Sequence, residues 1–270
     1  MKSVNSSHQH RSTDISLLIL VGALSIFGLL MVYDSSLMLA LRDFGDKYYY
    51  VREQVQWMIL GWIGCLVLSR IPYHLYKSIA LPLLIVVMVM LVMVFLPWVG
   101  VKALGAHRWI SIGPIVLQPA EFAKLATVIY LSAWLSKKEH GRLLAFVLLL
   151  GMLAGLILLE PDMGTTMILS TTSLFLYFVS GAPIKHFLYI VPVAAVLVIL
   201  LAIGSPYRFA RLTSFMNPDK DPLGSSYQIR QSIIALGSGG LFGVGLGKSR
   251  QKYEYLPEAN TDAIFSFVVG

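Results

Sequence analysis

The stretch Ile79–Trp98, IALPLLIVVMVMLVMVFLPW, contains no charged residue. A helix needs about 20 mostly apolar residues to cross the hydrocarbon core of a bilayer, so this stretch predicts a transmembrane helix. The whole chain has 270 residues, of which 57% are hydrophobic and 13% are charged. Soluble domains carry roughly 25% charged residues, so this chain lacks the charge to cover a soluble surface. The single cysteine, Cys65, excludes a scaffold held by internal disulfides.

Further apolar runs predict seven full spans and the start of an eighth near Asp262. The seven are Ile15–Tyr33, Val55–Ser69, Ile79–Trp98, Phe122–Leu135, Leu143–Leu159, Thr166–Ser180 and Phe187–Ile203. Val55–Ser69 and Phe122–Leu135 are short, so we expect both helices to extend into the flanking polar residues. The predicted fold class is an all-α, polytopic transmembrane helical bundle, formed by a single integral-membrane domain over residues 1–270.

The distribution of basic residues predicts a cytoplasmic N-terminus, with residues 1–14 as a cytoplasmic tail. Alternating the spans from that side places eight Lys and Arg residues in the inner segments and five in the short outer segments. This excess agrees with the positive-inside rule. Residues 204–261 then form a large extracytoplasmic loop with seven Lys and Arg residues, and its length favours a functional role. The net charge of +7 is scattered along the chain, which argues against nucleic-acid binding.

Three polar motifs with ionisable residues lie at the ends of spans. Inserting a charged side chain near the bilayer centre costs roughly 2.5–3.5 kcal/mol, so each of these residues is a candidate for function. The first is QPAEFAK at Gln118–Lys124. Glu121 and Lys124 lie one helical turn apart and can pair. The pair either only neutralises itself and fixes helix packing, or it contacts a substrate. The spacing leaves both interpretations open.

The second motif is EPDMGTT at Glu160–Thr166, where Pro161 and Gly164 interrupt two apolar runs. Broken backbone at membrane depth is tolerated only where protein or a water-filled cavity satisfies it. Asp162 either caps the following helix or lines such a cavity, and the sequence does not separate these roles.

The third motif is PEANTD at Pro257–Asp262, which places Glu258 and Asp262 four residues apart. A helix that begins here would carry both on one face, and acidic residues in a first turn are favoured by the helix dipole. Two close carboxylates can instead provide a general base and a neighbour that tunes its pKa.

The sequence contains no P-loop, no Gly-x-Ser-x-Gly motif and no Cys/His spacing typical of a metal site.

These segments together resemble the SEDS family of peptidoglycan polymerases, the family of FtsW, RodA and SpoVE. The resemblance covers nearly the whole chain and rests on GAHRWI, QPAEFAK, PDMGTT, NPDKDPLG, YQIRQS and the stretch Gly245–Asp262. The form GLGKSRQKYEYLPEA at Gly245–Ala259 is most similar to the FtsW branch. Members of the family carry further spans after this point, so the resemblance implies that the chain is C-terminally incomplete.

The resemblance implies a glycosyltransferase that polymerises lipid II during septal cell-wall synthesis in cell division. It implies a multi-pass protein of the bacterial inner membrane at the septum, with a class B penicillin-binding protein and other division proteins as partners. It allows a divalent cation, Mg or Mn, as the only cofactor. Asp262 matches the catalytic aspartate of the family. The other positions that match functional residues are Arg108, Trp109, Glu121, Lys124 and Asp162.

Glycosyl transfer from a lipid pyrophosphate needs a base for the acceptor hydroxyl and cations for the leaving group. We expect Asp262 to be the base and Glu258 to lie beside it at the substrate. The candidate cations are Arg108, Arg211, Lys248 and Lys252.

The chain departs from the family at three positions, where Ala120 replaces the usual Ser, Glu160 replaces the usual Gln and Asn260 replaces the usual His. The last change puts a proton relay through that histidine in doubt.

Two other functions stay open. A lipid II flippase would use Glu121, Lys124 and Asp162 to line a path through the bundle, and a division scaffold would need no chemistry. The ionisable motifs cluster towards the outer half of the predicted bundle. A flippase needs an anion-compatible path across both leaflets, so this placement favours the polymerase.

Overall fold

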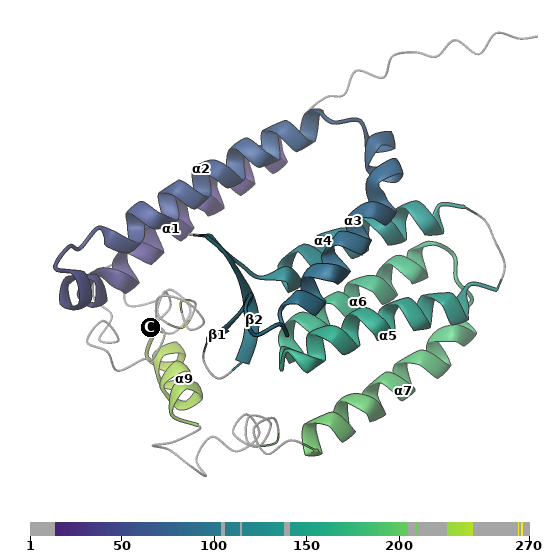
Figure 1. Cartoon of the computed structure of the whole chain (residues 1–270). Helices are drawn as coiled ribbons and strands as arrows, with labels where there is room; N and C mark the ends of the chain where they lie inside the picture. The colour runs from purple at the N-terminus through teal and green to yellow at the C-terminus, as the bar shows by residue number, and fades with distance from the viewer. Residues whose placement is uncertain are drawn as a thin grey trace, which may run out of the picture. The chain divides into compact units, whose positions relative to one another are not determined.

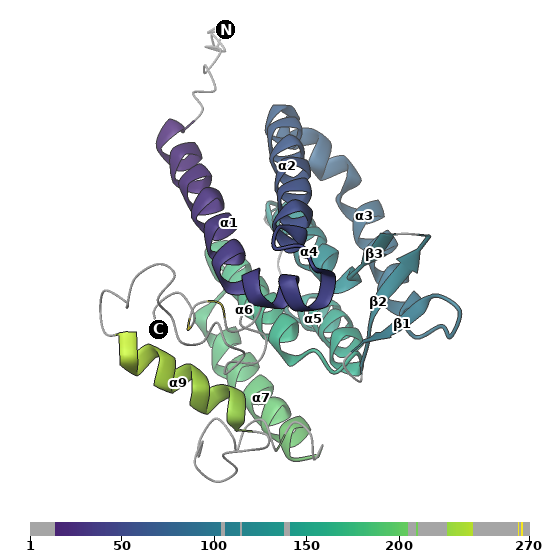
Figure 2. The same cartoon turned by 90° about the vertical axis from the view of Figure 1, so that its left-hand side faces the viewer.

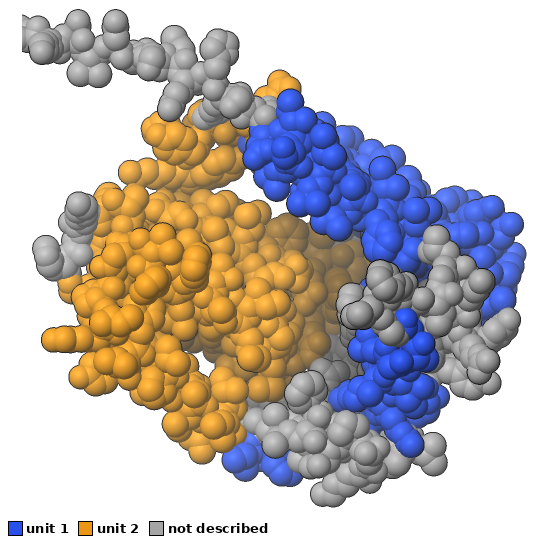
Figure 3. All heavy atoms as spheres, turned by 180° about the vertical axis from the view of Figure 1, so that it is seen from behind, with its two compact units in different colours: residues 1–68, 201–270 blue, residues 69–200 orange. Residues whose placement is uncertain are grey.

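The structure, a computed structural model, describes residues 14–103, 106–113, 115–137, 141–204, 209, 226–239, 264 and 266. The chain divides into two compact units, residues 1–68 with 201–270 and residues 69–200, which Figure 3 shows in different colours. Each unit is described by itself. Most of the predicted extracytoplasmic loop, the predicted tail before Asp14 and most of the eighth span lie outside the described residues. The single domain over the whole chain stays a prediction.

A helix occurs at each of the seven predicted spans (Figures 1 and 2). These are α1 Ile15–Phe44, α2 Tyr49–Arg70, α3 Tyr73–Met93, α4 Pro119–Leu135, α5 Leu143–Leu159, α6 Met163–Val179 and α7 Ile184–Ile203. The expected extension of the two short spans is confirmed, because α2 begins at Tyr49 and α4 at Pro119. The helix α3 ends at Met93, before the predicted Trp98, and turns lead from it into Pro97. A further helix, α9, spans Tyr227–Gly239.

The surface of these helices suits lipid. In the described part of the chain, α1 and α3 are long and apolar enough to cross a membrane, whereas α5, α6 and residues 184–200 of α7 are shorter apolar helices. Large apolar side chains remain exposed on several of them, such as Leu148 at 62% and Phe175 at 64%. Contiguous apolar surface of this extent marks a membrane or partner interface. The helical membrane fold predicted from the sequence is confirmed.

In the unit of residues 69–200, the core forms where α4 packs against its neighbours. Ala120, Ala123 and Ala126 share one face of α4, and each is at most 1% exposed. They pack in one cluster with side chains of α3, α5 and α6, including Leu91 and Leu153. Small residues let helix backbones approach closely, which matters in lipid because apolar burial there provides no driving force between helices. Ala120 therefore fits its position, although the family usually has Ser there.

Between α3 and α4 lies a small sheet that the sequence analysis did not predict. Its antiparallel strands are β1 Gly100–Ala103, β2 Ala106–Ile112 and β3 Ile115–Leu117, in that order. Apolar runs of this length cannot be told from loop by their periodicity. A side chain at Gly100 would collide with the carbonyl oxygen of Val94, so the turn from α3 into β1 needs glycine. The strands lie at one end of α4, α5 and α6 (Figure 1).

The same unit has a basic end opposite this sheet. It is formed by the starts of α3, α5 and α7 and the ends of α4 and α6. The described residues of 69–77, 135–137, 141–143 and 180–187 include no acid there. They include five cations, namely Arg70, Lys77, Lys137, Arg142 and Lys185. All five belong to segments predicted to be cytoplasmic, so the fold gathers these segments at one end.

The other unit contains α1, most of α2 and α9. Asp14 caps α1 because its side chain accepts a hydrogen bond from the Leu17 backbone N–H at 3.1 Å. The helix has 30 residues and ends at Gly45, whose φ is 67°. At 1.5 Å per residue its length is about 45 Å, more than the hydrocarbon core requires. At its far end Phe44 stacks on Tyr49, with ring centroids 3.7 Å apart, as aromatic residues do at membrane interfaces.

Candidate functional site

Arg108 on β2 reaches the break between α5 and α6. Its Nε donates to the carbonyl oxygen of Glu160 at 3.0 Å, and its Nη2 donates to that of Pro161. Ile110, two residues further along β2, is 1% exposed, so this part of the strand packs inward. The last carbonyls of a helix have no partner within it. Arg108 therefore supplies hydrogen-bond donors to carbonyl oxygens in the break that have no partner within the helix.

Asp162 caps α6 and also ties it to α4. Its Oδ1 accepts from the Thr165 backbone N–H at 3.0 Å, and its Oδ2 accepts from the Thr165 hydroxyl at 2.8 Å. Oδ2 also accepts from the Gln118 side-chain amide at 3.2 Å. The capping interpretation is thus confirmed. The bond from Gln118, which precedes α4, adds a contact between two polar motifs that are 44 residues apart.

Glu160 is fully buried in the break, outside both flanking helices. Among the described residues, neither carboxyl oxygen has a hydrogen-bond partner. The pKa of Glu160 is raised to about 8, mainly by burial and also by the nearby charge of Asp162, whereas the charge of Arg108 opposes the rise. The carboxyl group is therefore largely protonated at pH 7. A neutral carboxyl resembles a glutamine amide in shape and charge, which explains how Glu replaces the family's usual Gln.

The substitution Glu160→Gln is expected to remove one component of the pH dependence of stability. The folded state holds the proton of Glu160 up to about pH 8, whereas the unfolded chain releases it near the ordinary value of 4.5. The stabilisation is complete below pH 4.5 and is lost as the pH rises through 8, at a rate of at most about 1.4 kcal/mol per pH unit. Thermal unfolding in detergent between pH 5 and 9 measures this loss.

The wild-type melting temperature should fall with pH more steeply than that of Glu160→Gln. Glu53→Gln makes the same chemical change at an exposed position of α2 and should retain the wild-type slope. If Glu160→Gln and the wild type share one slope, Glu160 is not protonated in the folded state.

Glu121 and Lys124 pair on α4, as their spacing predicts. Lys124 Nζ lies 2.8 Å from Glu121 Oε1, and their side chains are 29% and 56% exposed. Lys124 also lines a cavity of about 30 Å³ together with Thr127 and Ser173. The ion pair is observed, whereas a direct contact with substrate stays a prediction.

The other predicted site residues are Trp109 and four residues outside the described part of the chain. Trp109 follows Arg108 on β2 and pairs with Val101 of β1, next to an irregularity in the register of the two strands. Four of the predicted site residues, Lys248, Lys252, Glu258 and Asp262, lie outside the described residues, as do Arg211 and Asn260. Within the part of the chain that the structure describes, no group of three or more His, Cys, Asp or Glu residues could hold a metal ion.

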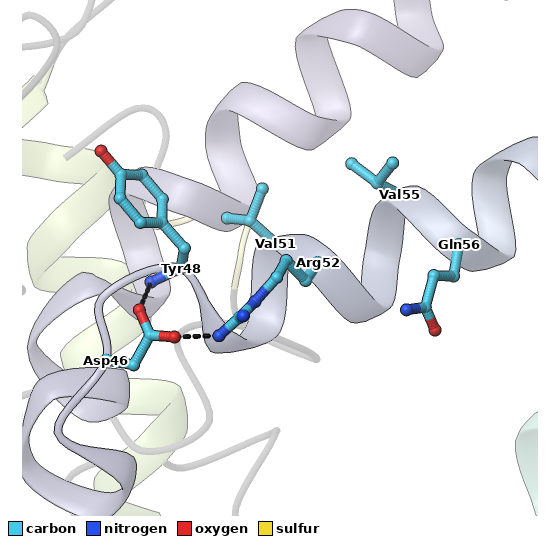
Figure 4. A pocket seen from close by; sticks show the side chains of 6 residues that line it. All are labelled: Asp46, Tyr48, Val51, Arg52, Val55 and Gln56. Atoms are coloured by element: carbon cyan, nitrogen blue, oxygen red, sulfur yellow. Dashed lines mark hydrogen bonds and ion pairs between the residues drawn. The ribbon is translucent and has the colours of Figure 1, made fainter.

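A separate hollow of about 620 Å³ lies beside the turn between α1 and α2 (Figure 4). Asp46 there accepts a hydrogen bond from the Tyr48 backbone N–H at 3.0 Å and pairs with Arg52. The remaining lining residues include Val51, Val55 and Gln56. Because its one acid and its one cation pair with each other, the hollow presents no net charge to a ligand.

Comparison with known proteins defines the class of this chain. A model of the FtsW, RodA and SpoVE cell cycle proteins matches residues 15–270. Probable peptidoglycan glycosyltransferase FtsW of Trichlorobacter lovleyi is 40% identical over 261 residues, 94% of this chain and 68% of the relative. The corresponding protein of Coxiella burnetii is 41% identical over 94% of this chain and 70% of the relative. Stage V sporulation protein E of Bacillus subtilis is 37% identical over 95% and 72%.

Solved structures share the fold. A chain of a peptidoglycan synthase complex, described as coordinating polymerization and crosslinking, matches with a TM-score of 0.69 and 28% identity over 86% of this chain and 67% of that one. The rod shape determining protein RodA of Thermus thermophilus matches with a TM-score of 0.58 and 21% identity over 96% of both chains. The protein is thus a helical membrane protein of the cell-wall synthesis class. It belongs to the FtsW/RodA/SpoVE family, and the FtsW names among its relatives support the FtsW branch.

Proposed function

We propose that this protein is a peptidoglycan glycosyltransferase that polymerises lipid II during division. The observation that carries the proposal is the 40% identity, over 94% of the chain, to a relative named as a probable peptidoglycan glycosyltransferase FtsW. The polar break supports it, because Arg108, Asp162 and Gln118 hold an ordered interruption between two apolar helices. The family usually places functional residues at the positions of Arg108 and Asp162.

The proposed reaction is an inverting transfer from an undecaprenyl-pyrophosphate donor. The 4-hydroxyl oxygen of the acceptor sugar attacks the anomeric carbon of the donor, and the bond from that carbon to the pyrophosphate oxygen breaks. Asp262 takes the hydroxyl proton, and undecaprenyl pyrophosphate leaves as an anion. A positioned base contributes about 10²–10⁴ to such a rate. Positive charge near the leaving group lowers the barrier further.

We propose different roles for the candidate cations. Arg108 uses Nε and Nη2 to hold the carbonyls of Glu160 and Pro161, so it is a positioning residue for the break. The charge facing the pyrophosphate is then left mainly to Lys248, Lys252 and Arg211 of the predicted extracytoplasmic loop. The proposed location is the bacterial inner membrane at the septum. The proposed partners are a class B penicillin-binding protein and other division proteins.

Purified protein tested with labelled lipid II separates this function from its rivals. The full-length protein, with a class B penicillin-binding protein, is expected to produce glycan strands in detergent micelles. A micelle has no second leaflet, so a flippase would produce no polymer there, and a scaffold would produce none in any medium. Absence of polymer with the partner bound and lipid II in excess would overturn the proposal.

A further inference from the structure

Two hollows lie side by side at the basic end of the unit of residues 69–200. The larger, of about 590 Å³, lies among the ends of α4 and α6 and the starts of α5 and α7, and Lys137, Arg142 and His186 line it. The smaller, of about 370 Å³, lies between α3 and α4, and Lys77 and Lys137 line it. Lys137 belongs to both. The larger volume is within the usual range for small-molecule sites.

The charge of these hollows is of one sign. Their linings include Lys77, Lys137 and Arg142, and no acidic side chain occurs among the described residues that line either hollow. Lys77 and Lys137 are exposed, so their ammonium groups are accessible. This arrangement favours an anion, and each lysine near a membrane surface contributes about 1 kcal/mol to the binding of an acidic headgroup.

The polar wall of the larger hollow is held in place by neighbouring contacts. Arg142 Nη1 donates to the carbonyl oxygen of Trp134 at 2.8 Å, and its guanidinium group lies 5.3 Å from the centroid of the Trp134 ring. The hydroxyl of Tyr177 and Nδ1 of His186 lie 2.8 Å apart. If the Tyr177 hydroxyl donates to Nδ1, the neutral ring of His186 carries its proton on Nε2, and Nε2 can then donate a hydrogen bond to a ligand. The charge of Arg142 and the ring of His186 are therefore positioned without a ligand.

Most of the remaining lining of each hollow is apolar. Leu135, Leu143 and Pro183 belong to the larger hollow, and Leu81 and Tyr130 to the smaller. Leu81 is 53% exposed, and the outer surface of this unit is apolar enough to face acyl chains. A free phosphate would use only the cations. A ligand with a phosphate and adjoining acyl chains would use both walls.

We propose that the basic end binds the headgroup of an anionic phospholipid of the cytoplasmic leaflet, with Lys137 as the central contact between the two hollows. The positive-inside distribution predicts that this end lies in that leaflet. Basic pockets between transmembrane helices on the cytoplasmic side are the setting in which anionic lipids bind. The site is at the opposite end of the unit from Arg108 and Asp162, so it is separate from the polar break.

Binding of fluorescent phosphatidylglycerol to the purified full chain in mixed micelles tests the proposal. We expect phosphatidylglycerol to bind more tightly than phosphatidylcholine. Lys137→Ala should weaken binding about fivefold, and Lys77→Ala with Lys137→Ala about 25-fold, at about 1 kcal/mol per lysine. Lys47→Ala removes a cation from the turn between α1 and α2 and should leave the affinity unchanged. Thermal unfolding of each variant verifies that it is folded.

Several outcomes would overturn the proposal. One is equal affinity for the two lipids, and another is an unchanged affinity in the double variant. Displacement by millimolar inorganic phosphate would instead identify a free-phosphate site. If a peptide of ten glutamates required Lys137 while phosphatidylglycerol did not, the site would be for an acidic partner segment. The readout is binding, so the result is independent of whether the protein polymerises lipid II.

Discussion

Asp262→Asn is expected to lower lipid II polymerisation by at least ~100-fold, because a positioned general base contributes about 10²–10⁴ to the rate. Asparagine keeps the size of the side chain and removes its ability to take the proton of the acceptor hydroxyl. The glycan products of labelled lipid II, separated by length, measure the loss. The class B penicillin-binding protein must be present with the full-length protein in every reaction.

The control is Asp43→Asn, which makes the same change at an exposed aspartate that pairs with Arg42 at the end of α1. It should polymerise lipid II at the wild-type rate. The Asp262 variant must also unfold at the wild-type temperature and bind the partner, so that loss of activity is not loss of fold. Near-normal glycan strands from a folded Asp262→Asn protein would remove this residue from the proposed mechanism.

Arg108→Ala is expected to destabilise the protein by about 2–4 kcal/mol and to abolish most activity. The guanidinium group donates to two carbonyl oxygens in the break, and an unsatisfied buried polar group costs about 1–3 kcal/mol. The effect on activity follows from the position of Asp162, which caps α6 directly after those carbonyls. Thermal unfolding in detergent measures the first effect, and glycan synthesis measures the second.

Two further variants separate positioning from charge. Arg52→Ala removes an exposed cation that pairs with Asp46, and exposed ion pairs contribute at most about 1 kcal/mol, so this protein should remain close to wild type. Arg108→Lys keeps the charge but lacks the planar fork that reaches two carbonyls. If Arg108→Lys restores stability in full, the two hydrogen bonds are not what holds the break. If Arg108→Ala loses no stability, Arg108 has no positioning role there.

The helices were predictable because membrane spans obey a simple rule of length and polarity. All seven predicted spans contain a helix, and the short predicted span Phe122–Leu135 begins earlier, at Pro119, as expected. The sheet was not predicted, because β3 has only three residues and is too short to show a strand periodicity, although it pairs with the strand directly before it in the sequence. Helix propensity and hydropathy carry no information on such pairing.

The residues of the candidate site could be predicted from the sequence, but the contacts between them could not. The motif around Asp162 left a cap and a cavity-lining carboxylate open, and the structure contains the cap. The contact from Arg108 to Glu160 joins residues 52 apart, and no periodic pattern can indicate it. The sequence predicts a contact between Arg108 and the substrate, whereas its described contacts are with protein backbone. The resemblance marked Glu160 as a departure, and only its full burial explains why a carboxyl group can replace the amide.

The alanines on the inner face of α4 limit which sequences this fold can accept. Ala120, Ala123 and Ala126 are almost inaccessible, so the space between α4 and its neighbours has no room for a larger side chain. Serine, the usual residue of the family at position 120, is close to alanine in volume, so either side chain fits this face. Natural variation along α4 should therefore be wide in chemistry at its lipid-facing positions and narrow in volume along this one face.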